Sequence, residues 1–250
     1  MALSKSRFRP GLWPTLAALL VCALFLRLGW WQWERAQYKD TVIAEYAART
    51  ARAPVPLNAV LADSTLESLP RYLHLTADGA YDGVRQLLLE DMTHEGQVGY
   101  EVLTPFLLQP GGSLLLVDRG WVAADARGAA PAVDVASGAR RIEGVLDQLP
   151  VPGLKVGTPA PPPAGWPKRL FYPDLRELKG FYGPAFTGLV VKLAATQPDG
   201  YLREERAEVG FPPERHLAYA FQWLLMAIAV AALWLVLNLR RSRRGMTDGG

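Results

Sequence analysis

The chain has 250 residues, of which 27 are basic (Lys or Arg) and 24 are acidic, so its formal net charge is only +3. The region between residues 34 and 215 is mildly acidic, which argues against a basic nucleic-acid-binding surface. The single cysteine, Cys22, excludes an internal disulfide, a CxxC redox pair and a thiolate-based metal site within one chain.

The first predicted element is an apolar helix over residues 12–33. Arg27 interrupts it, but it stands near an aromatic end formed by tryptophans, where an arginine can snorkel toward a membrane surface. Basic residues in the tail 1–11 precede it, as in a signal peptide. No small-residue cleavage site follows, so an uncleaved transmembrane helix is favoured.

Residues 217–239 form a second apolar segment, and it carries no formal charge. At a helical rise of about 1.5 Å per residue it is long enough to cross the hydrocarbon core. The tail 240–250 is basic, like the N-terminal tail, so the positive-inside rule places both termini in the cytoplasm. We therefore expect a two-span protein of the bacterial inner membrane, with residues 34–216 as a periplasmic domain.

Between the spans, residues 34–52 are expected to continue the first helix, and short strands follow. Period-two alternation begins at Tyr72, and further strands are predicted at 84–90, 100–108, 114–119, 141–149, 168–172 and 186–194. Strands joined by Gly and Pro turns, without long helices between them, favour a mainly antiparallel, partly barrel-like β domain between the transmembrane helices. Residues 150–167 are rich in Pro, Gly and Ala, so we expect a loop there, and we assign it no function.

The domain offers no motif for catalysis. The sequence contains no GxSxG, HExxH, Walker or GxGxxG pattern, and its three histidines are too scattered to predict a zinc site. We therefore predict that the chain is not an enzyme, with a periplasmic membrane-bound enzyme as the alternative. A transmembrane receptor is disfavoured, because only a short tail follows the second span.

His216 stands at the outer end of the second span and is the strongest candidate for a binding role. On a helix it shares a face with Tyr219, Ala220, Trp223 and Ala227. Small residues allow another helix or a flat cofactor to approach, and a neutral imidazole is a common ligand of haem iron. An interfacial histidine that only anchors the helix end is the alternative.

Depth in the membrane links Arg27 with Gln222. By the helical rise, each lies roughly 8–9 Å inside the outer end of its span. An intramembrane arginine usually finds a partner within the protein. The hypothesis is that Arg27 hydrogen-bonds Gln222, or meets the carboxylates of an anionic ligand beside His216.

Several blocks of sequence occur in one order along the chain: LGWWQWER at 28–35, THEG at 93–96, GY at 99–100, LTPF at 103–106, LVDRGWV at 116–122 and HLAYAFQW at 216–223. Together they resemble the Surfeit locus protein family of cytochrome c oxidase assembly factors, although that family usually shows Asn in place of Asp118. A fold-keeping role is favoured for the blocks in the domain. Arg119 is the expected exception, because a charge between an apolar strand and Trp121 needs solvent or a partner.

The resemblance implies a non-enzymatic factor that assists maturation of the haem-containing subunit of cytochrome c oxidase, or haem A insertion into it. It implies that subunit as partner, with haem A synthase as a second candidate, in a lipid bilayer and without nucleic acid. It makes His216 the candidate axial ligand of haem A, with Tyr219, Trp223, Arg27 and Gln222 around it. The alternative is a haem-independent membrane chaperone that stabilises an oxidase assembly intermediate.

Overall fold

The computed structural model describes residues 10–63, 68–126, 131–149, 164–171, 173–207 and 209–244. Most of the predicted loop 150–167 and the ends of both tails therefore lie outside the described residues. The chain divides into two compact units, one made of the residues up to Ala44 and from Ala207 onward, the other of Glu45–Arg206. Each unit is described by itself.

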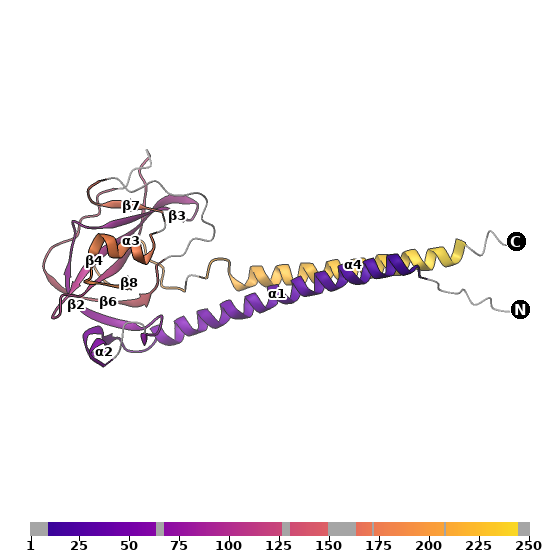
Figure 1. The fold of residues 1–250 in the computed structure, drawn as a ribbon, viewed down its shortest axis with the longest axis horizontal. Coiled ribbons are helices and arrows are strands. Elements are labelled where there is room, and N and C mark those ends of the chain that lie inside the picture. Colours follow the sequence, from indigo (N-terminus) through magenta and orange to yellow (C-terminus); the bar gives the residue numbers. More distant parts are fainter. Residues whose placement is uncertain are drawn as a thin grey trace, which may run out of the picture. The chain divides into compact units, whose positions relative to one another are not determined.

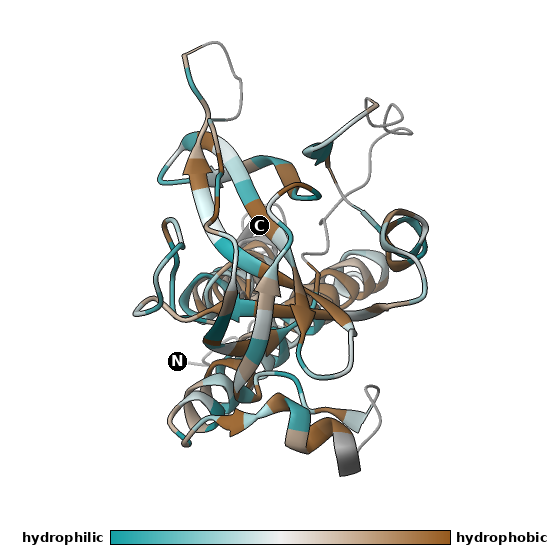
Figure 2. Cartoon of the chain, turned by 90° about the vertical axis from the view of Figure 1, so that its left-hand side faces the viewer, coloured by the Kyte–Doolittle hydropathy of each residue, from teal (hydrophilic) through white to brown (hydrophobic). Residues whose placement is uncertain are grey.

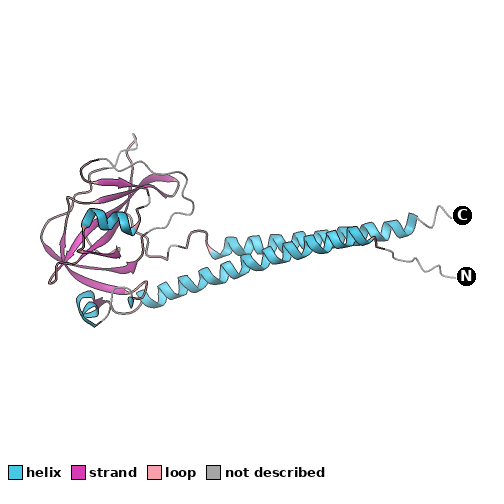
Figure 3. Cartoon of the chain, in the orientation of Figure 1, coloured by secondary structure: helices cyan, strands magenta, loops and turns pink. Residues whose placement is uncertain are grey.

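The first unit is built from two long helices (Figures 1 and 3), α1 (Leu12–Thr50) and α4 (Pro213–Arg244). Both are long and apolar enough to cross a membrane. Large apolar side chains cover their outer faces, with Leu20 72% and Leu233 59% exposed, as suits a lipid-facing surface. The prediction that the first helix continues past residue 33 is confirmed, because α1 ends only at Thr50, shortly before Pro54.

The two helices are antiparallel and meet along a regular seam. On α1 the less exposed residues recur in alternating steps of three and four, which is the spacing of a left-handed coiled coil. They are Thr15, Ala18, Cys22, Phe25, Gly29, Gln32, Ala36 and Lys39. Their counterparts on α4 include His216, Ala220, Trp223, Ala227, Val230 and Trp234.

Contacts fix the register of this seam along its length. Trp234 Nε1 donates a hydrogen bond of 3.1 Å to Thr15 Oγ1 at one end. Near the middle, the rings of Phe25 and Trp223 lie 5.5 Å apart between centroids. Several seam positions carry small side chains, which allows the two backbones to approach closely.

The second unit is built, within the described residues, on one eight-stranded mixed sheet (Figure 1). Its strands are β1 (Val55–Pro56), β2 (His74–Tyr81), β3 (Leu87–His94), β4 (Gln97–Leu108), β5 (Leu114–Ala123), β6 (Ala139–Asp147), β7 (Lys168–Leu170) and β8 (Phe186–Leu193). The strand order is β1-β2-β6-β8-β5-β4-β3-β7. The last strand in sequence, β8, therefore lies in the middle of the sheet.

Five of the strand pairings are antiparallel, and three, β1–β2, β3–β7 and β5–β8, are parallel. β2 also pairs with β4 over three residue pairs, so the ladder turns back on itself through β6, β8 and β5. Because this contact is short, we describe the domain as a curled mixed sheet and not as a barrel.

Buried side chains lie on both faces of the sheet. Burial alternates along β2, and hydrophobic and hydrophilic residues alternate on several other strands (Figure 2). One core gathers around Phe106 and Val191 inside the curl. The second lies between the sheet and the short helix α3 (Leu175–Tyr182), whose buried residues are Leu178 and Tyr182.

The predicted strands correspond closely to the observed ones, with two instructive differences. The strand expected at 84–90 begins at Leu87, because Asp82 Oδ1 accepts the backbone N–H groups of Val84 and Arg85 at 3.1 Å and holds a turn there. Two short helices, α3 and α2 (Leu57–Asp63), were not predicted. α3 is capped by Asp174, whose carboxylate accepts the N–H of Glu177 at 2.8 Å.

Candidate functional site

The candidate site is a hydrogen bond across the helix pair. His216 lies in the first turns of α4, and its Nδ1 is 2.7 Å from Oε1 of Gln32 on α1. An amide oxygen can only accept, so in this geometry Nδ1 carries the proton and donates it. The other ring nitrogen, Nε2, is buried and has no hydrogen-bond partner among the described residues. Its lone pair therefore accepts no hydrogen bond from the described residues.

Close packing of the helices surrounds this imidazole. A Cβ added to Gly29 would lie 3.4 Å from the carbonyl oxygen of Ala220 and 3.5 Å from Trp223 Cβ, which shows how near the backbones are. The helical face that His216 shares with Ala220, Trp223 and Ala227 is thus the face that contacts α1. The sequence allowed either another helix or a flat cofactor against this face, and in the structure α1 lies there.

The five predicted site residues do not all lie together. His216 and Trp223 face the seam, whereas Tyr219 is 50% exposed and Arg27 and Gln222 are also exposed. Arg27 lies two residues from both Phe25 and Gly29, which is about 200° around the helix and places it on the side of α1 away from α4. The structure therefore does not pair Arg27 with Gln222. Equal depth in the membrane says how far along its helix each residue lies, but not which side of the helix it is on.

Gln32 was missed as a site residue. It belongs to the sequence block at 28–35, and its seam position follows from the three-and-four spacing of Cys22, Phe25 and Gly29. Further along the same seam, Lys39 is 6% exposed, and its ammonium group donates to the carbonyl oxygen of Val209. The seam thus changes from small and apolar residues to polar ones toward this end.

The site offers one suitable ligand atom for a haem iron, because Nε2 of a neutral histidine with its Nδ1–H hydrogen-bonded is a common iron ligand. The donor chemistry therefore fits. In this arrangement, however, Nε2 is covered by protein atoms. Coordination at Nε2 would require the protein atoms that cover it to move aside.

In the domain, Arg119 on β5 is 1% exposed, and all three nitrogens of its guanidinium group donate hydrogen bonds. Its Nε donates to the carbonyl oxygen of Asp199 at 2.6 Å, and its two Nη atoms donate to those of Val133 and Asp134 at 3.0 Å. Its guanidinium also lies 5.0 Å from the ring centroid of Tyr201. Arg119 has the partners that its charge requires, and these partners tie the segments around Val133 and Asp199 to β5, which is a structural role.

The glycine after Arg119 completes this junction. Gly120 has φ of 99°, and its N–H donates to Asp118 Oδ1 at 2.9 Å. A Cβ on Gly120 would meet the backbone of Leu202, which pairs with Trp121 through two backbone hydrogen bonds. The block LVDRGWV thus fastens the segment after β8 to the sheet.

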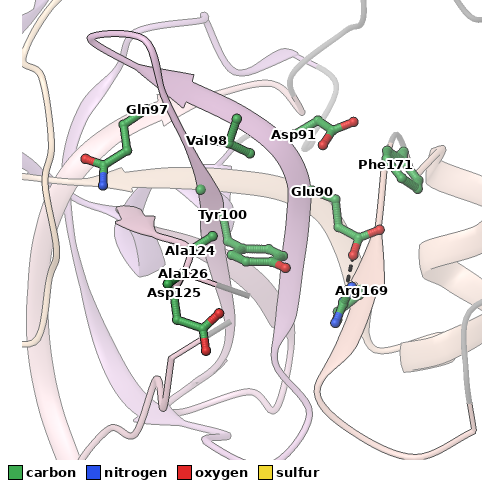
Figure 4. Close-up of a pocket in the computed structure, with 11 residues that line it drawn as sticks. Glu90, Asp91, Gln97, Val98, Tyr100, Ala124, Asp125, Ala126, Arg169 and Phe171 are labelled. Carbon is green, nitrogen blue, oxygen red and sulfur yellow. Dashed lines mark hydrogen bonds and ion pairs between the residues drawn. The ribbon is translucent and has the colours of Figure 1, made fainter. Parts of the chain in front are cut away.

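The domain also carries a surface pocket of about 730 Å³ beside β3, β4 and β7 (Figure 4). Glu90 and Arg169 form an ion pair of 2.6 Å in its wall, and this bond with Glu90 raises the pKa of Arg169 above its ordinary value. Tyr100 and exposed Phe171 also line it. Among the described residues, its lining includes no Ser, Cys, His or Lys.

Among the residues that the structure describes, no group of three or more His, Cys, Asp and Glu side chains could hold a metal ion. His74 and His94 lie in the domain and have partners of their own. His74 Nε2 is 3.0 Å from Glu143 Oε1, and His94 Nδ1 is 3.6 Å from Glu204 Oε1. Of the three histidines, His216 is the one with a buried ring nitrogen that has no hydrogen-bond partner among the described residues.

Comparison with known proteins places these features in a family. The SURF1 family profile matches residues 19–228. Human Surfeit locus protein 1 is 28% identical over 236 residues, covering 86% of this chain and 74% of the human one, and a SURF1-like protein of Monosiga brevicollis is 24% identical over 239 residues, covering 91% and 88%. The cytochrome oxidase assembly protein SHY1 of Saccharomyces cerevisiae is 26% identical over 95 residues, or 38% of this chain and 24% of the yeast protein. The chain belongs to the SURF1 family.

Proposed function

We propose that this protein assists the assembly of cytochrome c oxidase by helping its haem-containing subunit to mature, without catalysing a reaction itself. The observation that carries this proposal is the family match, which begins in α1, crosses the whole domain and ends in α4. A relative is named as a cytochrome oxidase assembly protein. The two apolar helices suit a factor that works on a subunit embedded in the membrane.

The proposed setting is the bacterial inner membrane, with both termini in the cytoplasm and residues 34–216 in the periplasm. Basic residues in both terminal tails support this orientation. The proposed partners are the haem-bearing oxidase subunit and, as a second candidate, haem A synthase.

Within this function, we propose that His216 is an axial ligand for haem A in transit to the oxidase. The buried Nε2 without a partner among the described residues supports this role, because the hydrogen bond from Nδ1 to Gln32 leaves the Nε2 lone pair free. Haem A would be bound as cargo, and the protein would catalyse no reaction with it. Trp223 lies on the same face, whereas Tyr219, Arg27 and Gln222 could contribute only from the outer faces of the helices.

A haem-independent membrane chaperone is the second candidate, and one observation favours it. Nε2 is covered by the packed helices, so the described arrangement holds no open face for a porphyrin. On this alternative, His216 serves the helix seam alone, and the protein stabilises an oxidase intermediate through other surfaces.

The assembly function is tested by deleting the gene in its host and measuring the haem A absorbance and oxidase activity of the membranes. We expect both to fall and to return with the wild-type protein. Unchanged oxidase content in the deletion strain would refute the function.

The haem role is tested on the detergent-purified protein, co-expressed with haem A biosynthesis. We expect a haem A absorption band in the wild type and in His94→Ala, but not in His216→Ala. A band that persists in His216→Ala excludes the ligand role. No band in any of the three proteins, together with normal rescue of the deletion, would select the haem-independent chaperone.

A further inference from the structure

Gln32 and His216 form a polar pair in an otherwise close-packed part of the seam. Toward one side their neighbours in the seam are Gly29 and Trp223, and toward the other they are Ala36 and Lys39, and none of these side chains offers an acceptor. Trp223 carries one donor, its indole N–H, and no acceptor. Loss of this partly buried hydrogen bond would leave a polar atom on each side of the seam without its partner in the protein.

The geometry distinguishes the two neutral forms of the histidine. With the amide oxygen of Gln32 facing Nδ1, the proton resides on Nδ1, and Nε2 is a bare acceptor. If the amide were turned to present its NH₂ group, Nδ1 would have to accept, and the proton would move to Nε2. Either form leaves Nε2 without a hydrogen-bond partner among the described residues, as a bare acceptor in the first and as an N–H donor in the second. The amide oxygen of Gln32, which faces Nδ1, selects the first form.

We propose that Gln32 is a positioning residue for His216, which holds the imidazole in the Nδ1–H form and fixes the ring so that Nε2 is the only atom able to bind iron. This rests on the proposed ligand role of His216. Gln32 touches neither iron nor porphyrin in this scheme. It acts as the outer partners of metal-binding histidines do, by setting which nitrogen is protonated and how the ring is turned.

The proposal is tested first without haem. The protein is labelled with ¹⁵N in histidine, and the ring nitrogens of His216 are observed by NMR in detergent at about pH 8, above the ordinary histidine pKa of about 6.5. We expect a protonated Nδ1 and a bare Nε2 in the wild type. In Gln32→Leu we expect the two forms to mix, and in Gln32→Glu the carboxylate should restore the Nδ1–H form.

Gln37→Leu is the matched control, because Gln37 is exposed on the same helix and lies outside the seam. It should leave the spectrum of His216 unchanged. A proton on Nε2 in the wild type, or an unchanged ring spectrum in folded Gln32→Leu, would overturn the proposal. Gln32→Glu keeps the test valid if Gln32→Leu does not fold, because it must retain the wild-type form.

Titration with haem A supplies the second readout. We expect the affinity of Gln32→Leu to fall by about 10- to 100-fold, and that of Gln32→Glu and Gln37→Leu to stay near the wild type. If the wild type itself binds no haem A, the proposed ligand role fails, while the NMR result still shows whether Gln32 sets the protonation of His216. The two failures are therefore distinguishable.

Discussion

The backbone of Gly99 on β4 lies directly against the indole ring of Trp121 on β5. A Cβ added to Gly99 would stand 2.5 Å from Trp121 Cε2, and closer still to the carbonyl oxygen of Val122. The indole is also fixed from its edge, because Trp121 Nε1 donates to the carbonyl oxygen of Met92 at 2.9 Å. The ring cannot move aside without breaking that bond.

Gly99→Ala should therefore destabilise the domain by about 1–3 kcal/mol, as overpacking does in a close-packed site. The measurement is the unfolding of the full chain in detergent, followed by tryptophan fluorescence. Gly180→Ala is the matched control, because a Cβ at this exposed position of α3 meets nothing within 4 Å, and it should be neutral or stabilise by up to about 1 kcal/mol. Equal stability of Gly99→Ala and wild type would contradict this packing.

Arg119→Met should lower the free energy of unfolding by at least about 2 kcal/mol. It removes the donors from the carbonyl oxygens of Asp134 and Asp199, and each acceptor left alone costs about 1–3 kcal/mol, whereas Val133 keeps the hydrogen bond from Gln86 Nε2. Arg176→Met, at an exposed position of α3, should change stability by less than about 0.5 kcal/mol. Limited proteolysis provides a second check, because the segment around Val133 should be cut faster in Arg119→Met alone.

Ionisation of the buried Tyr81 hydroxyl should make the domain less stable at alkaline pH. Burial raises its pKa to about 12, although the nearby charge of Arg119 acts in the opposite direction. The unfolded chain releases this proton near the ordinary tyrosine pKa of about 10, so stability is fully present below that pH and is lost as the pH rises from about 10 to 12. Two pKa units correspond to about 2–3 kcal/mol.

Tyr81→Phe should remove that part of the alkaline loss. Its hydroxyl is buried without a hydrogen-bond partner among the described residues, so the substitution should cost less than about 1 kcal/mol at neutral pH. Unfolding measured at several pH values between 7 and about 12 decides this, with Tyr38→Phe, an exposed ring on α1, as control for the loss of one phenol. Parallel pH profiles for wild type and Tyr81→Phe would contradict the assignment.

Cys22 provides a direct test of the helix seam, because its Sγ lies 3.5 Å from the carbonyl oxygen of Ala227 and it is the only cysteine of the chain. Ala227→Cys should form an intramolecular disulfide with Cys22 on mild oxidation of the full-length protein. Ile228→Cys, at the next position but 54% exposed, should not. Mass spectrometry of alkylated thiols distinguishes the two. Equal cross-linking of both variants would mean that the helices do not keep this register.

Most of the strands were predictable because the domain alternates and its turns carry Gly and Pro. The strand expected at 114–119 is observed as Leu114–Ala123, and the one expected at 186–194 as Phe186–Leu193. The parallel pairing of β5 with β8 was not predictable, since nothing local in either strand specifies a neighbour so distant in sequence. α3 was missed because eight residues give too short a period to distinguish from a loop.

Only the α4 side of the candidate site could be predicted from the sequence. The helical periodicity after His216 grouped Ala220, Trp223 and Ala227, which do face the seam, with Tyr219, which is exposed, and the partner of that face depends on how α1 is rotated. Depth alone suggested Arg27, whereas the contact belongs to Gln32, about one and a half turns further along α1. The spacing of the small residues on α1 indicates which side of that helix faces α4, and depth in the membrane does not.

The central place of β8 has a consequence for the order of folding during synthesis. β5 and β6 are completed well before Phe186–Leu193 leaves the ribosome, yet in the finished sheet they border β8 and not each other. The sheet of the nascent domain therefore lacks its central strand until β8 has been made. Contacts between residues so far apart in sequence also form slowly. β8 is followed closely by α4, so the domain can close only shortly before the second apolar helix leaves the ribosome.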